Sequence, residues 1–155
     1  QVLAGDVDAA VNFWHYNARL KAAGLREVIS VEDAIKALGI SGSAPMLGYA
    51  FRAGWAKDHR EDVIGFLRAS RATKALLASS TEEWQRLRPR MKASEDEVFD
   101  SLIAGYRAGI PSRWGEPERS AAARLFEVMA DAGGKKLVGE SLKLTPGTFW
   151  PEWSF

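Results

Sequence analysis

The sequence of 155 residues contains no cysteine and no long apolar run. Without cysteine, disulfides, thiolate catalysis and Cys-based metal sites are excluded. No apolar run approaches the roughly 18 residues that are needed to span a bilayer, and no charged-then-apolar leader opens the chain. The first residue is Gln1 rather than Met, so we expect the start to be processed, cut or engineered. The missing leader therefore says nothing about export.

The sequence also has no large excess of charge of either sign, and it lacks the common catalytic motifs. The chain has 21 Lys and Arg against 20 Asp and Glu, a net charge of +1, which calls for neither nucleic acid nor an anionic membrane. There is no Gly-x-Gly-x-x-Gly, phosphate-cradling Gly-Lys-Ser/Thr or Gly-x-Ser-x-Gly. His15 and His59 are the two histidines, and neither has a His or Glu at metal-ligand spacing. We expect no metal, no cofactor and no nucleic-acid partner.

The hydrophobic pattern predicts strands early and helices late. Residues 7–14, 26–31 and 46–52 are apolar and β-favouring, which is typical of strands. Short helices are expected at 17–23 and 33–38, and a longer amphipathic one at 61–77. Capping boxes of the form Ser-x-x-Glu begin at Ser80 and Ser94 and predict two further helices. The last helix has Pro117 in its first turn and ends at Gly133-Gly134. This order favours an α/β or α+β fold.

The N-terminal block holds the most informative group of residues. Behind Gly5-Asp6-Val7-Asp8-Ala9, the chain places Asn12, Trp14 and His15 at the end of a predicted strand. Ligands of open α/β sheets bind outside the carboxyl ends of strands, and aromatic walls with a few polar groups suit a small-molecule site. The alternative is that Phe13 and Trp14 belong to the core, since aromatic side chains are usually buried for packing.

The element Gly5-Asp6-Val7-Asp8-Ala9, followed by an aromatic-rich strand, resembles the motif of periplasmic solute-binding proteins of the nitrate/sulfonate/taurine class of ABC importers. Leu38-Gly39, the segment 46–51 and the helix 61–77 follow in the order of that family. The resemblance covers nearly the whole chain, but only the family's C-terminal half. It implies the C-terminal half of a type II periplasmic binding fold, with residues 1–40 in the second lobe and hinge. Residues 41–155 would belong to the first lobe, with a helical C-terminal region.

The resemblance also implies a function. A chain of this family binds a small molecule in an interlobe cleft without chemistry, and the closed form docks on an ABC permease. It would be exported to the periplasm. By position, Asp8 would close the helix–strand element, and Asn12, Trp14 and His15 would contact the ligand. Because the family's first half is missing, exposed sheet edges are expected to promote self-association.

Two other functions stay open. Pyrimidine synthases of thiamine biosynthesis resemble the same fold, and His15 could then serve a pyridoxal cofactor, although no lysine stands beside it. The other is a helical protein-interaction module. Its partner-binding surface would be formed by tryptophans, namely Trp84, Trp114, Trp150 and Trp153.

Overall fold

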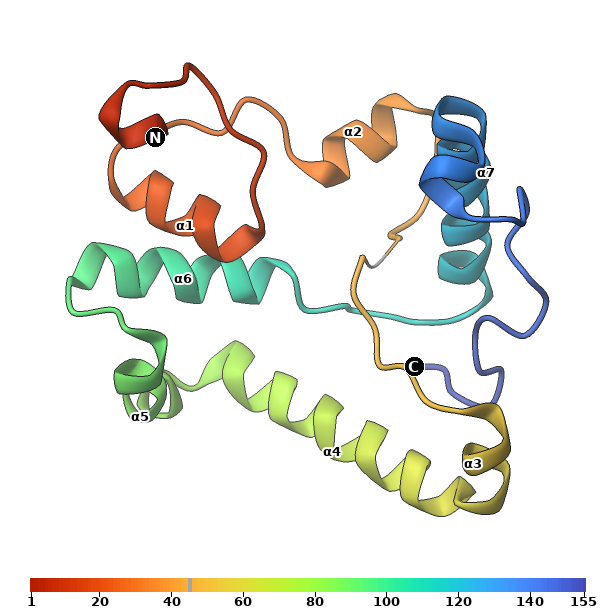
Figure 1. Ribbon diagram of the computed structural model, residues 1–155. Helices are drawn as coiled ribbons and strands as arrows, with labels where there is room; N and C mark the ends of the chain where they lie inside the picture. The colour runs from red at the N-terminus through yellow and green to blue at the C-terminus, as the bar shows by residue number, and fades with distance from the viewer. Residues whose placement is uncertain (45) are drawn as a thin grey trace. The chain divides into compact units, whose positions relative to one another are not determined.

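A computed structural model describes residues 1–44 and 46–155, and within them every regular element is a helix. A short 3-10 turn comes first and seven α-helices follow (Figure 1). Their bounds are η1 Val2–Ala4, α1 Trp14–Ala22, α2 Val31–Ala37, α3 Ala53–Asp58, α4 Arg60–Ser79, α5 Thr81–Met91, α6 Asp96–Ala108 and α7 Glu116–Val138. No helix in the described part of the chain is both long and apolar enough to cross a membrane.

The predicted α/β fold is therefore wrong, and with it the predicted C-terminal half of a type II binding fold. None of the segments 7–14, 26–31 and 46–52 forms a strand, and α1 and α2 begin at the ends of the first two. A short apolar run does not by its periodicity distinguish a strand from other buried or irregular chain. A strand also needs neighbours, since even a two-stranded hairpin is marginal in water.

The longer helices are where their patterns place them. The predicted helix 61–77 is α4, and Ser80 caps α5 by accepting a hydrogen bond from the Glu83 amide at 3.2 Å. The capping box predicted at Ser94 is wrong, because α6 has Glu95 at its N-cap and no side-chain cap. The predicted stop at Gly133-Gly134 coincides with a break in α7, where the backbone leaves the helical conformation. Gly134 has φ 55° and ψ −155°, and helical turns resume up to Val138.

The chain divides into two compact units. Unit 1 comprises Gln1–Val28 and Gly65–Ile110, and unit 2 comprises Ile29–Ile64 and Pro111–Phe155. The assignment of residues 1–40 and 41–155 to two lobes of a binding protein stays a prediction.

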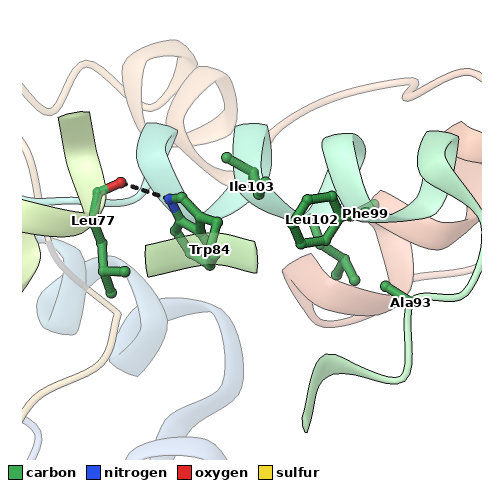
Figure 2. Packing of buried hydrophobic residues seen from close by; sticks show 7 residues of the cluster. Leu77, Trp84, Ala93, Phe99, Leu102 and Ile103 are labelled. Carbon is green, nitrogen blue, oxygen red and sulfur yellow. Dashed lines mark hydrogen bonds between the residues drawn. The ribbon is translucent and has the colours of Figure 1, made fainter. Parts of the chain in front are cut away.

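The core of unit 1 is built around Trp84 on α5. Its side chain is 4% exposed and packs with Leu77, Phe99, Leu102 and Ile103 (Figure 2). The indole Nε1 donates a hydrogen bond of 2.7 Å to the carbonyl of Leu77, drawn as a dashed line in Figure 2. A buried Trp usually satisfies its N–H in this way. This contact ties the end of α4 to α5.

Helix α1 lies along α6 within unit 1 (Figure 1). Small residues make the close packing possible: Ala18 is buried, and its carbonyl accepts a hydrogen bond of 2.7 Å from Ser101 Oγ. Arg19 on α1 donates from Nη2 to the carbonyl of Met91 at 2.8 Å. The position of α1 is thus set both by packing and by hydrogen bonds.

Unit 2 has a smaller core, formed by Ile35, Ile40, Ala44 and Ala121, with Leu125 and Val128 packed against it. The C-terminal tail beyond α7 contains no helix. Its last residue is held by two backbone hydrogen bonds of 2.9 Å, one in each direction between Trp114 and Phe155.

Candidate functional site

The candidate site begins at the first turn of α1. Phe13 has an extended conformation (φ −65°, ψ 153°) and stands at the N-cap, and its carbonyl accepts the amides of Tyr16 and Asn17. The Asn17 side chain donates from Nδ2 to the carbonyl of Asn12 at 3.4 Å. The Tyr16 amide is one of the first N–H groups of the helix, which regular α-helical bonding leaves without a partner, and its bond to Phe13 satisfies it. These bonds fix the chain at the point where it turns from irregular structure into the helix.

Four consecutive rings follow one another here, and we call Phe13, Trp14, His15 and Tyr16 the aromatic cluster. The rings of Phe13 and His15 stack with centroids 6.1 Å apart and an interplanar angle of 3°. His15 also contacts Tyr16 at 4.4 Å and meets Trp14 at 5.7 Å in an edge-on geometry. These separations are those of favourable aromatic pairs. His15 is therefore the centre of the cluster.

The cluster is open to solvent rather than enclosed. Phe13 is 71% exposed, Tyr16 52% and Trp14 43%, while His15 is half-buried and Asn12 is exposed. Large exposed apolar surfaces are characteristic of binding sites when they are contiguous. The open rings offer faces on which a planar or apolar group can stack.

Trp14 is fixed on one side by α6. A Cβ built on Gly105 would lie 3.3 Å from Trp14 Cε3, so the indole edge occupies the space that a larger residue would fill. The Tyr106 ring meets the indole at 6.1 Å and also meets Trp84 at 5.1 Å, both edge-on. Sequence reasoning missed Gly105 and Tyr106. Glycine within a helical pattern is a signal of close packing, but it does not name the partner.

The charged residues of α1 are already engaged. Arg19 donates to two backbone carbonyls, those of Met91 at 2.8 Å and Lys92 at 3.3 Å. Lys21 forms an ion pair of 2.5 Å with Glu27. The site therefore combines aromatic faces and amides with cations that have other partners, which suits a neutral or weakly charged ligand better than a strongly anionic one.

The four predicted site residues do not all meet. Asn12, Trp14 and His15 lie together because they are close in sequence. Asp8 is exposed in the irregular segment before the cluster, and among the described residues no hydrogen bond or ion pair links its side chain to the rings. Residues 7–14 form no strand, so the helix–strand junction at which Asp8 is predicted to act is not present.

A second aromatic–histidine pair lies in unit 2. The rings of Trp55 and His59 stack at 4.8 Å with an interplanar angle of 18°, and His59 Nδ1 is 3.3 Å from Asp62 Oδ2. A shallow hollow of about 340 Å³ is lined by residues 57–62. Trp55 is 48% exposed, close to the value for Trp14. This pair also combines a tryptophan with a histidine, but it lacks the four consecutive rings of the aromatic cluster. Trp55 is therefore a suitable comparison for Trp14.

No group of three or more His, Cys, Asp or Glu side chains gathers in a way that could hold a metal ion within residues 1–44 and 46–155. Of the tryptophans predicted for an interaction surface, Trp84 is buried in the core, and Trp114, Trp150 and Trp153 are half-buried. Searches for related proteins were negative: no protein-family model matches the chain, and no curated protein matches it.

Proposed function

We propose that this chain is a non-catalytic binding protein that holds a small molecule on the aromatic cluster, as the solute-binding component of an ABC importer. The observation that carries the proposal is that the Trp14 side chain is both ordered and exposed. One edge of its indole is fixed against Gly105, while 43% of the side chain stays exposed. A ring that is already ordered loses little conformational freedom when a ligand stacks on it.

The polar groups around the rings support the same proposal. Asn12 is exposed beside the cluster, and His15 offers ring nitrogens at its centre. A small number of placed polar groups on an apolar wall is the usual composition of a small-molecule site. The resemblance of Gly5-Asp6-Val7-Asp8-Ala9 to the importer proteins supplies the biological role. The proposal requires only the cluster of unit 1.

A helical protein-interaction module is the second candidate. It is favoured by the number of large apolar side chains that stay exposed, such as Val11, Val28 and Leu47, which are more than 70% exposed. Patches of this kind mark protein interfaces as well as ligand sites. A module of this class would respond to protein concentration and not to a small molecule.

Tryptophan fluorescence distinguishes the two candidates. The chain is titrated with nitrate, taurine and benzenesulfonate, which cover inorganic, aliphatic and aromatic probes. Trp14→Ala should weaken the tightest of these interactions about tenfold, equal to about 1.4 kcal/mol. Trp55→Ala is the matched control, because Trp55 is similarly exposed and its ring also contacts a histidine ring.

The proposal predicts saturable binding that Trp55→Ala leaves unchanged. No response of the unmodified chain to any probe would contradict binding itself. An equal loss in the two variants would contradict the assignment of the site to the aromatic cluster.

A further inference from the structure

The tail of the chain, which follows α7, has two parts with different contacts. Residues 139–148 are exposed apart from Leu144, which is half-buried. Among the described residues, their hydrogen bonds and ion pairs stay within this stretch or reach only Lys135 in α7. We call residues 139–148 the linker and residues 149–155 the anchor. The polar contacts of the linker therefore do not hold the anchor in its place.

The anchor is held by residues that are distant in the sequence and belong, like the anchor itself, to unit 2. The Phe149 ring packs edge-on against Trp114, with centroids 5.2 Å apart. The next ring, that of Trp150, meets Phe51 edge-on at 5.7 Å. Both separations are those of favourable aromatic pairs. Two consecutive residues of the anchor thus have ring partners from two different segments of the chain.

An ion pair and a pair of backbone bonds complete the attachment of the anchor. Glu152 Oε2 accepts a hydrogen bond from Nε of Arg60, the first residue of α4. Phe155 and Trp114 exchange two backbone hydrogen bonds of 2.9 Å, as paired residues of antiparallel strands do. We call Phe51, Arg60 and Trp114 the tail surface. None of these three residues belongs to the tail.

The contacts of the anchor have the form of peptide recognition. When an extended peptide binds a protein, main-chain hydrogen bonds provide affinity and side chains at set positions provide specificity. The anchor presents two aromatic rings, a carboxylate and a backbone pair in a fixed order along the chain. Its carboxylate meets a cation of the tail surface, so the two sides are complementary in charge. Pro151 fixes one φ angle of the anchor, which reduces the conformational freedom that binding removes.

We propose that the tail surface is a peptide-binding site, that the anchor occupies it as a tethered ligand, and that a separate peptide of the same chemistry binds there when the anchor is released. The partner is an extended segment with two adjacent aromatic residues and an acidic residue two positions further on. A short flexible tether keeps its ligand at a millimolar effective concentration, so the anchor excludes weakly binding peptides. This site belongs to unit 2, and the aromatic cluster belongs to unit 1.

Fluorescence polarisation with a dye-labelled peptide of residues 148–155 gives the first test. In the full chain, Phe149→Ser combined with Trp150→Ser removes both ring contacts of the anchor and leaves the tail surface unchanged. We expect this released variant to bind the peptide about tenfold more tightly than the unmodified chain, in which the tethered anchor competes. Leu142→Ser is the control, because Leu142 is 50% exposed in the linker, and it should bind as the unmodified chain does. Equal affinities of the released variant and the unmodified chain, or no binding to either, would overturn the proposal.

An exchange of charges gives a second test, which depends on a side chain at the surface. The Arg60 side chain is 51% exposed, so Arg60→Glu in the released variant should leave the fold intact. It should weaken binding of the peptide about threefold, the size expected of an exposed ion pair, and a peptide with Glu152→Arg should restore the affinity. Arg124→Glu is the matched control, because Arg124 is 62% exposed and pairs with Glu127 in the same unit. An equal loss in the control, or a loss that the reversed peptide does not restore, would refute recognition through Arg60.

Discussion

The carbonyl of Leu77 offers a direct test of how unit 1 is held together. It accepts two side-chain hydrogen bonds, one of 2.7 Å from Trp84 Nε1 and one of 3.1 Å from Arg107 Nε. Leu77 is buried, with 8% of its surface exposed. Trp84→Phe removes the first donor while keeping a ring in the core, and Arg107→Met removes the second while keeping an apolar stem.

The size of each effect follows from these contacts. A net hydrogen bond contributes about 1 kcal/mol, and Trp84→Phe also loses packing, so we expect it to lower the free energy of unfolding by about 1–3 kcal/mol. Arg107→Met should cost about 1 kcal/mol. In either single variant the carbonyl keeps one donor. In the double variant a buried carbonyl is left without a partner, which adds about 1–3 kcal/mol beyond the sum.

Urea unfolding of the four proteins in this cycle measures the coupling. We expect the double variant to lose more free energy of unfolding than the two single variants together, by about 1 kcal/mol or more. Trp84→Phe combined with Arg124→Met is the control, because Arg124 is exposed and bonds Glu127 in unit 2. Losses in the test cycle that add within about 0.5 kcal/mol would refute the shared-acceptor reasoning.

Three further outcomes are expected. Gly105→Ala should weaken ligand binding several-fold and alter the near-UV circular dichroism, because its Cβ would lie 3.3 Å from Trp14. The gain in helix propensity limits any loss of stability. Unchanged near-UV spectra would contradict this prediction. Ser80→Ala should lower the free energy of unfolding by about 1 kcal/mol through the lost cap on Glu83, and an unchanged urea midpoint would count against it. Finally, hydrogen bonds from the Glu82 amide and then from the Ser80 hydroxyl lower the pKa of Glu82 below its ordinary value of 4.5. Its contribution is complete above that pH and is lost as the pH falls through the folded pKa, so Glu82→Gln should flatten the acid limb of stability.

The helices that sequence predicts correctly are those with a long apolar stripe or a side-chain cap. Helix α4 follows its amphipathic pattern, and α5 begins at the Ser80 cap. The segments 7–14 and 46–52 fail because β-favouring composition describes a surface that needs neighbouring strands. No neighbouring strand is present among the residues that the structure describes. Trp14 is also of a β-favouring type, yet it begins α1 and packs against Gly105.

Only the part of the site that is formed by residues close together in the sequence could be predicted. Asn12, Trp14 and His15 lie together because they are near neighbours in the chain, but Gly105 and Tyr106 come from a distant helix that periodicity does not place. Arg88 belongs to a run of basic residues, Arg86, Arg88, Arg90 and Lys92, and a run of this kind is usually a solvated face. Nη2 of Arg88 donates at 2.6 Å to both Ser94 O and Asp96 Oδ1, and its guanidinium lies over the Phe99 ring at 4.6 Å.

The central claim is that an open, pre-ordered ring at Trp14 receives the ligand. Nuclear magnetic resonance of the six indole N–H groups tests this most directly, with each signal assigned through a Trp→Phe variant. Adding the tightest-binding probe should shift the Trp14 signal and leave that of Trp84, whose N–H is bonded to Leu77, in place. A ligand that shifts the Trp55 signal while Trp14 stays unmoved would contradict the assignment.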